Sequence, residues 1–205
     1  MISDLTPLDV VQKHYSQVDP VIANVLPSIN WSDWFEDRPS SDNFYNLTRN
    51  IVYQQLAGKA ASTIFARFEK LVTDITPLRV LAIEDQELRD VGLSWAKVRY
   101  VKDLASKVNS GEVSLVDLND LDNEAVINEL IKVKGIGRWT AEMFLLFTLH
   151  RENIFSYGDL GLKNGLAKLY KIDITKTDEI TNIVNRWAPY ESYGSIALWH
   201  SLDNT

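Results

Sequence analysis

The sequence contains no cysteine, only three histidines and no long hydrophobic run. The missing cysteines exclude disulfides, zinc sites with thiolate ligands, thiolate-held iron–sulfur clusters and a cysteine nucleophile. The histidines His14, His150 and His200 are scattered along 205 residues, which argues against a histidine-rich metal site. The densest apolar run, residues 143–147, is far too short to span a bilayer. The N-terminal stretch has no basic start and no apolar core, so we expect a soluble, intracellular protein without a membrane partner.

Positive charge is also scarce, because 21 lysines and arginines stand against 28 aspartates and glutamates, a net charge of −7. Such a balance argues weakly against a nucleic-acid-binding protein, since those domains tend to be basic. The charge is uneven, however. Residues 112–129 hold six acids and no base, residues 132–138 hold three bases and no acid, and residues 97–107 hold four bases and one acid. The sequence therefore predicts local positive surface on an acidic protein.

Helical signals run through nearly the whole chain, and no segment alternates apolar and polar residues with a period of two. Residues 44–56 carry apolar side chains at spacings near 3.6. Ser94 is typical of a helix N-cap, and Thr175 with Asp178 has the spacing of a capping box. The sequence therefore predicts an all-α fold.

Four of the six tryptophans are expected to lie in the hydrophobic core, because most buried indoles serve packing alone. They are Trp31, Trp34, Trp95 and Trp187.

The most informative segment is residues 128–143, NELIKVKGIGRWTAEM. It predicts a helix, a tight Gly-Ile-Gly turn and a second helix, since two glycines permit positive φ and close backbone approach. Ile136 can dock between the two helices, and the amides that start the second helix then form an anion site. With Lys134 and Arg138 alongside, the indicated ligand is a phosphodiester backbone. The alternative is a helix–helix turn that needs glycine only for its geometry.

Residues 130–146, LIKVKGIGRWTAEMFLL, resemble the helix-hairpin-helix element of the HhH-GPD superfamily of DNA base-excision glycosylases. Three further segments resemble that family in the family's order. Residues 50–65 would present the loop that wedges into the DNA double helix. Residues 154–170 contain the family's Asp, and residues 186–200 resemble the C-terminal pocket helix. The most similar branch is the 3-methyladenine DNA glycosylase II (AlkA-like) type. So little chain precedes residues 50–65 that the resemblance implies the compact form, without the N-terminal β domain of longer relatives.

The resemblance implies a two-lobed helical protein with its helix-hairpin-helix at about residues 122–149. One lobe would contain about residues 40–135. The other would contain about residues 1–39 and 136–205, with the DNA groove between the lobes.

The resemblance also implies that Asp159 is the catalytic carboxylate. A fixed carboxylate stabilises the oxocarbenium-like sugar that forms when an N-glycosidic bond breaks, or orients the attacking water. Because Asp159 precedes a helix, the alternative role is a simple N-cap. Family members that also cut the strand carry a lysine just after the hairpin arginine, whereas this chain has Trp139 there, so no lyase activity is expected.

Further site residues follow from the same resemblance. A flipped base would be held in a pocket lined by Trp139, Met143, Trp199, His200, Gln55 and Tyr157. DNA would be contacted by the wedge Leu56 and by Gly58, Lys59, Lys134, Gly135, Gly137, Arg138 and Thr140. No cofactor is implied, except a Na⁺ or K⁺ ion at the hairpin held by the backbone carbonyls of Ile131, Val133 and Gly135.

The implied function is monofunctional hydrolysis of alkylated purines, 3-methyladenine and 7-methylguanine, from duplex DNA in base excision repair, leaving an abasic site. The implied partner is double-stranded DNA containing damaged bases, and the expected state is a monomer in the prokaryotic cytoplasm (nucleoid) or the eukaryotic nucleus. The open alternatives are a glycosylase for ethenoadenine, hypoxanthine or uracil, a catalytically silent DNA-binding module, and a helical protein-interaction domain.

Overall fold

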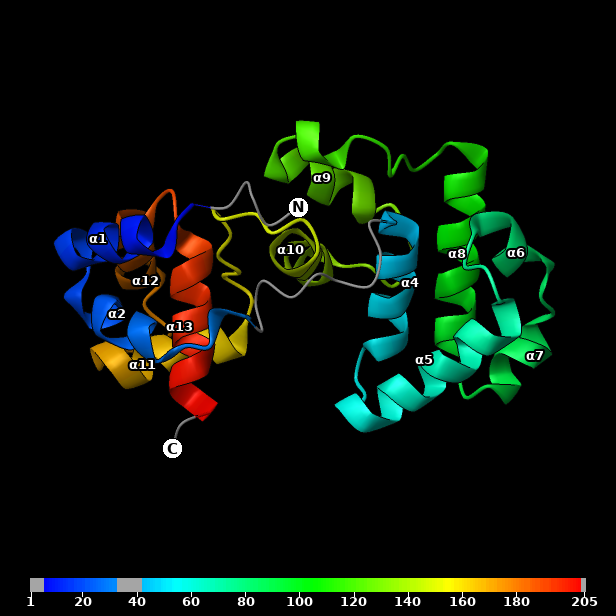
Figure 1. The fold of residues 1–205 in the computed structure, drawn as a ribbon, viewed down its shortest axis with the longest axis horizontal. Coiled ribbons are helices and arrows are strands. Elements are labelled where there is room, and N and C mark those ends of the chain that lie inside the picture. The colour runs from blue at the N-terminus through cyan, green and yellow to red at the C-terminus, as the bar shows by residue number, and fades with distance from the viewer. Residues whose placement is uncertain (1–5, 33–41, 204–205) are drawn as a thin grey trace. The chain divides into compact units, whose positions relative to one another are not determined.

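The computed structural model describes residues 6–32 and 42–203, and every regular element within these ranges is a helix (Figure 1). The all-α prediction is therefore confirmed. None of the helices in the described ranges is long and apolar enough to cross a membrane.

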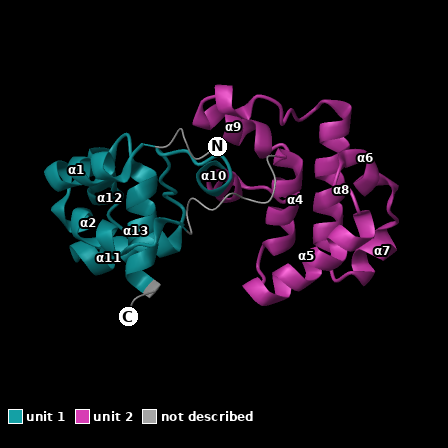
Figure 2. Ribbon diagram, in the orientation of Figure 1, with its two compact units in different colours: residues 1–37, 145–205 teal, residues 38–144 magenta. Residues whose placement is uncertain are grey.

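The chain divides into two compact units (Figure 2). Unit 1 contains residues 1–37 and 145–205, and unit 2 contains residues 38–144. The boundary after residue 144 lies later in the chain than the boundary after about residue 135 that the family resemblance implies. The hairpin stays with unit 2 because it is bonded to helices there: the Lys134 amide donates to Asp103 Oδ2 over 2.8 Å, and Gln54 Nε2 donates to the Gly135 oxygen over 3.0 Å.

Unit 1 is built from both ends of the chain. Its elements are α1 (Leu8–Val18), α2 (Pro20–Val25), the 3-10 helix η2 (Leu26–Ser28), α11 (Leu160–Tyr170), α12 (Thr177–Val184), the 3-10 helix η4 (Asn185–Trp187) and α13 (Glu191–Asp203). Unit 2 contains α4 (Asn43–Tyr53), α5 (Gly58–Val72), α6 (Pro77–Ala82), α7 (Asp85–Asp90), α8 (Trp95–Ser110), the 3-10 helix η3 (Leu118–Asp120), α9 (Asn123–Leu130) and most of α10 (Arg138–Phe147).

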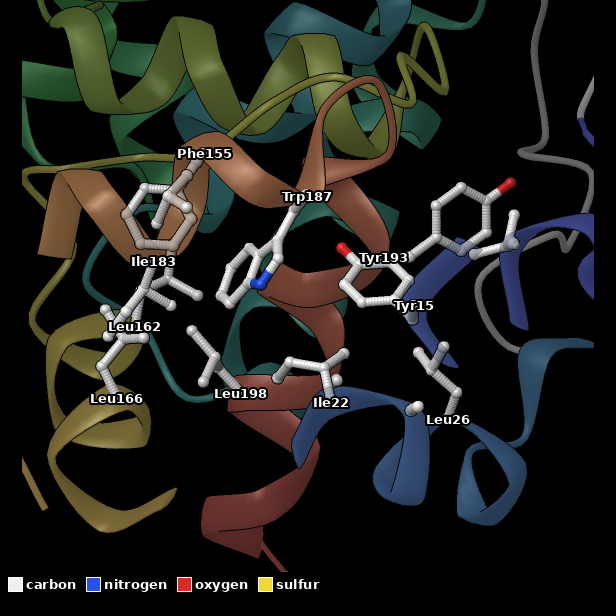
Figure 3. Close-up of a cluster of buried hydrophobic side chains, with 14 of the residues drawn as sticks. Tyr15, Ile22, Leu26, Phe155, Leu162, Leu166, Ile183, Trp187, Tyr193 and Leu198 are labelled. Carbon is white, nitrogen blue, oxygen red and sulfur yellow. The ribbon is translucent and has the colours of Figure 1, made fainter. Parts of the chain in front are cut away.

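Trp187 lies in the centre of the core of unit 1 (Figure 3). Trp187, Tyr15 and Tyr193 are fully buried, and removing such large aromatic surfaces from water is strongly favourable. Helices α11 and α13 approach closely at Gly165, where a Cβ would lie 2.9 Å from the backbone oxygen of Leu198. Only glycine permits this contact, and it holds α11 against α13.

Asp19 is the polar centre of the same unit and is only 2% exposed. As the N-cap of α2, its Oδ1 accepts the amides of Val21 and Ile22. Its Oδ2 accepts the Tyr170 hydroxyl over 2.6 Å and the Trp187 indole N–H over 2.8 Å. A buried carboxylate is tolerated only when it is satisfied in this way.

The prediction of four core tryptophans is confirmed for Trp187 and holds in part for Trp31, which packs against the same core while partly buried. It is wrong for Trp95, which is 48% exposed and lies under the guanidinium of Arg89 at 5.2 Å. An indole at the first position of a helix can satisfy its ring by a cation–π contact instead of by burial. Trp34 lies outside the described residues.

The lysines of α8 correct the expectation of positive surface at residues 97–107. Each of them donates to backbone carbonyls at the C-terminal end of a neighbouring helix. Lys97 reaches the end of α4, Lys102 reaches Leu81 and Ile83 around the end of α6, and Lys107 reaches Lys132 beyond the end of α9. Cations favour the negative end of a helix dipole, so these charges stabilise the packing of unit 2.

The predicted helix N-cap is confirmed at Ser94, whereas the predicted capping box of Thr175 and Asp178 is wrong. The Ser94 hydroxyl accepts the amide of Lys97, as expected for an N-cap. Thr175 instead donates its amide and its hydroxyl to Asp173 Oδ1, over 2.9 and 2.8 Å, and α12 starts later, at Thr177. An aspartate two residues upstream competes with the helix for the same local donors.

Candidate functional site

Asp159 stands at the N-terminus of α11 in unit 1. It is the N-cap of that helix, and its Oδ1 accepts the amide of Leu162 over 2.7 Å. Its own amide donates to the Ser156 oxygen over 3.0 Å, which fixes the backbone before the helix begins. The first turn of a helix favours negative charge, so the N-cap role and a charged, functional carboxylate are compatible at this position.

Trp199 on α13 contacts the same carboxylate. Its indole N–H donates to Asp159 Oδ1 over 3.2 Å, and the ring of Phe147 stacks on Trp199 at 5.8 Å with an interplanar angle of 23°. Gly161 lies beneath the pair, because a Cβ there would be 3.0 Å from both Asp159 Oδ1 and Trp199 Nε1. The structure therefore brings the predicted residues Asp159 and Trp199 together.

Phe147 and Gly161 were missed by the sequence analysis. Gly161 carried one available signal, since a glycine inside a helix usually has a packing reason. Phe147 carried none, because nothing local links it to a ring 52 residues further along the chain.

Two other predicted pocket residues have identified neighbours in unit 1. Tyr157 is exposed, and its ring meets Phe155 edge-on at 4.9 Å. Partial burial and the nearby charge of Glu191 raise the pKa of the Tyr157 phenol. His200 is hydrogen-bonded through Nε2 to the Ser28 hydroxyl over 3.1 Å, on η2. Since successive residues of a helix lie about 100° apart around its axis, His200 and Trp199 point in different directions.

The hairpin in unit 2 has the predicted tight turn, but only one of its two glycines is needed, since Gly137 has no positive φ and open space for a Cβ. Gly135 has a φ of 83°, and a Cβ there would lie 2.2 Å from the Tyr100 ring, so glycine is needed for both conformation and space. Ile136 is buried, as expected for a residue docked between helices. The Gly137 oxygen accepts the amide of Ala141 over 3.0 Å, which starts α10. The amides of a first helical turn have no partner within the helix, which suits them to an anion.

The basic side chains of the hairpin are closer to acids than their sequence window indicates. Lys134 is 73% exposed, but its Nζ lies 3.5 Å from Asp103. Arg138 pairs through both terminal nitrogens with Glu124, and its Nε donates to Glu142 over 2.9 Å. These carboxylates raise the pKa of Arg138, and Arg138 lowers the pKa of Glu124. The hairpin is therefore less positive than residues 132–138 alone suggest.

The predicted wedge loop follows α4 in the same unit. Gln55 has a φ of 57°, a left-handed conformation that is uncommon for residues other than glycine. Leu56, Gly58 and Lys59 are all exposed, and no side chain caps the N-terminus of α5. An exposed leucine on a strained turn beside an open helix start agrees with the geometry that a wedge and a phosphate contact would need.

Helix α10 presents the remaining predicted residues. Trp139 is 48% exposed, Met143 is partly buried, and the Thr140 hydroxyl accepts Gln54 Nε2 over 3.4 Å. These residues belong to unit 2, whereas Asp159 and Trp199 belong to unit 1. A base pocket that joins the two sets, and the groove expected between the lobes, stay predictions.

Two of the three carbonyls expected to hold a monovalent cation already accept protein hydrogen bonds. Val133 accepts the Ile136 amide over 3.1 Å, and Gly135 accepts Gln54 Nε2 over 3.0 Å. A carbonyl oxygen has a second lone pair, so these contacts do not prevent ion binding. The ion, with Ile131 as its third ligand, stays a prediction.

Comparison with known proteins gives the same family over most of the chain. The sequence profile described as HhH-GPD superfamily base excision DNA repair protein matches residues 48–189. The Bacillus subtilis protein YfjP is 31% identical over 78% of this chain, which spans 59% of the length of YfjP. DNA-3-methyladenine glycosylase 1 of Schizosaccharomyces pombe is also 31% identical, over 97% of this chain and 88% of its own length.

The fold is likewise similar to a solved structure. The Schizosaccharomyces pombe 3-methyladenine DNA glycosylase in complex with abasic DNA superimposes with a TM-score of 0.74 at 27% identity. The match covers 94% of this chain and 96% of that one.

Proposed function

Since the chain belongs to the HhH-GPD superfamily of base excision DNA repair proteins, we propose that it is a monofunctional DNA glycosylase that releases alkylated purines from duplex DNA. The observation that carries the proposal is the position of Asp159. Its carboxylate stands at a helix N-terminus, where the Leu162 amide and the Trp199 indole N–H hold Oδ1. Relatives that match the chain over most of its length bear the name DNA-3-methyladenine glycosylase and support this substrate class.

The reaction breaks the bond between C1′ of the deoxyribose and the purine nitrogen. Both electrons of that bond go to the base, and an alkylated purine that was cationic in DNA leaves as a neutral molecule. The sugar becomes oxocarbenium-like, and the fixed negative charge of Asp159 stabilises it. Water then adds to C1′ and loses one proton, which leaves an abasic site. Because a cationic base is already a good leaving group, the site needs to stabilise the sugar more than it needs to protonate the base.

Exposed aromatic rings supply the means to hold an extrahelical base. Trp139 is 48% exposed and Tyr157 is exposed, while Trp199 lies against the carboxylate. A flipped base stacks on such rings, and the electron-rich face of an indole attracts a positively charged purine. We propose that the rings of Tyr157 and Trp199 line the base pocket beside Asp159. The pocket roles of Trp139, Met143, His200 and Gln55 stay predictions from the family resemblance.

Strand cleavage by β-elimination is not part of the function. That chemistry needs an amine to form a Schiff base with C1′, and the position after the hairpin arginine is Trp139. The product is therefore an intact strand with an abasic site.

Duplex DNA is the partner, and unit 2 supplies the proposed contacts. Leu56 would fill the gap that the flipped base leaves, while Gly58 and Lys59 hold a phosphate. A second phosphate would bind at the hairpin. Its contacts would be the amides of Gly135 and Gly137 and the charged side chains of Lys134 and Arg138. We propose a monomer that acts on damaged duplex DNA in the nucleoid or the nucleus.

The test is incubation with duplex DNA treated with a methylating agent, followed by chromatography of the released bases. Release of 3-methyladenine or 7-methylguanine is expected, and denaturing gels should show strands that stay whole until alkali is added. Salt-sensitive DNA binding without release of either base would contradict the proposal. The same assay on duplexes with ethenoadenine, hypoxanthine or uracil would then separate another glycosylase from a silent binding module.

A further inference from the structure

We propose that Gln54 is a positioning residue that couples the wedge loop to the phosphate-binding hairpin, an inference that rests on the proposed function. Gln54 is the C-cap of α4 and lies two residues before Leu56. Its side chain leaves the loop and reaches the hairpin. Nε2 donates to the Gly135 oxygen over 3.0 Å and to the Thr140 hydroxyl over 3.4 Å. One side-chain amide therefore joins two segments that are 81 residues apart in sequence.

The backbone of Gln54 is held from a second side. Lys97 Nζ donates to the oxygens of Val52 and Gln54, over 2.7 and 2.6 Å, at the C-terminal end of α4. Burial lowers the pKa of Lys97, so this ammonium has given up part of its hydration and depends on those carbonyls. A cation at a helix C-terminus also interacts favourably with the helix dipole. The loop thus starts from a fixed point.

Helix α8 supports both partners of this contact. Lys97 holds the start of the loop, and Tyr100, one turn further along, lies directly under Gly135 of the hairpin. Because two residues of chain span at most about 7 Å, the position of Leu56 is set within a short reach of Gln54. A phosphate bound at the hairpin would consequently fix where the leucine meets the base stack. This is the register that base flipping requires.

The decisive variant is Gln54→Met, which keeps the length of the side chain and removes its donors. The matched control is Gln86→Met on α7 of the same unit, where the amide donates to exposed Asp90 over 2.8 Å. The readouts are the melting temperature, the salt dependence of binding to undamaged duplex, single-turnover excision, and the fluorescence of 2-aminopurine. The fluorophore is placed next to a tetrahydrofuran abasic analogue, where it reports wedge insertion without any chemistry.

We expect Gln54→Met to lower the excision rate about fivefold and to reduce the 2-aminopurine signal, since the hydrogen bonds to Gly135 and Thr140 are both lost. Binding to undamaged duplex and its salt dependence should match the control, because every phosphate contact remains. Gln54→Glu should be impaired further, as a carboxylate repels the Gly135 oxygen. Excision rate and 2-aminopurine signal should therefore decrease from the wild type to Gln54→Met to Gln54→Glu. A role of Gln54 in packing alone does not predict this order.

Equal 2-aminopurine signals for wild type, Gln54→Met and Gln54→Glu would overturn the inference. Gln54→Met could have a lower melting temperature than Gln86→Met. In that case the 2-aminopurine signals of Gln54→Glu and the wild type are compared at a temperature where both are folded, and equal signals again overturn the inference. The abasic-analogue duplex needs no excision. Failure of the wild type to release any base would therefore count against the proposed function, and loss of coupling would still be measured independently.

Discussion

The indole N–H of Trp199 donates a hydrogen bond to Asp159 Oδ1 over 3.2 Å, and this contact joins α13 to the N-terminus of α11. The same oxygen accepts the Leu162 amide over 2.7 Å. The carboxylate is thus oriented by one donor from its own helix and one from a distant part of unit 1. A group that stabilises charge without moving during the reaction is the arrangement that electrostatic catalysis needs.

Trp199→Phe tests the contribution of the indole donor. The variant keeps an aromatic ring for stacking on Phe147 and loses the hydrogen bond to a charged group, which should slow excision about tenfold. Binding to DNA should be retained. Single-turnover excision is the measurement, and Trp95→Phe, at an exposed indole in unit 2, is the control. A Trp199→Phe enzyme as fast as the wild type would show that the indole N–H does not orient Asp159.

Gly161→Ala tests the space beneath the pair. The added Cβ would lie 3.0 Å from both Asp159 Oδ1 and Trp199 Nε1, so one of them must shift. Alanine is favoured over glycine within a helix by about 1 kcal/mol, which offsets part of the crowding. Excision should therefore fall several-fold while the melting temperature changes little. Gly158→Ala is the control because a Cβ there has open space, and equal rates for the two variants would refute this reading.

Asp19→Ala tests the polar centre of unit 1. The substitution removes an N-cap and leaves the buried donors of Trp187 and Tyr170 without their acceptor. The free energy of unfolding should fall by about 3–5 kcal/mol. Thermal or urea unfolding measures the loss, and exposed Asp178→Ala should change it little. If the two alanine variants unfolded at the same temperature, Asp19 would contribute no more to stability than an exposed aspartate in a first helical turn.

Glu124→Gln tests whether Arg138 contacts phosphate. The exposed pair adds little stability by itself, so the variant should melt like the wild type. The variant frees the terminal nitrogens of Arg138, while Nε keeps its bond to Glu142. This should tighten binding to undamaged duplex and steepen the slope of log affinity against log salt by up to about one. Glu179→Gln, which releases Lys176 in another exposed pair, makes the same change in net charge. If the two variants had the same slope of log affinity against log salt, Arg138 would not contact a DNA phosphate.

The features that the sequence predicted well depend on few neighbouring residues. The all-α fold follows from apolar spacing, the start of α8 from Ser94, and the hairpin turn from Gly135, whose positive φ allows its geometry. The N-cap role of Asp159 is confirmed, and its catalytic role, which the family resemblance implies, stays a prediction.

The features that were missed depend on contacts between distant segments. No local sequence pattern predicts that Gln54 bonds to Gly135 or that Phe147 stacks on Trp199. Charge was misread for the same reason. The three lysines of α8 bind the carbonyl ends of other helices, and Arg138 pairs with an acid from α9, so a count of bases in a window overestimates positive surface.

The excision rate of Asp159→Asn on methylated duplex DNA tests directly whether Asp159 is the catalytic carboxylate. Asparagine keeps the shape of the side chain and its acceptor for the Leu162 amide, so the fold and the affinity for DNA should stay as in the wild type. Because the amide carries no charge to stabilise the sugar cation, release of 3-methyladenine should fall by at least about a hundredfold. If Asp159→Asn bound DNA normally and released bases at the wild-type rate, Asp159 would not be the catalytic carboxylate.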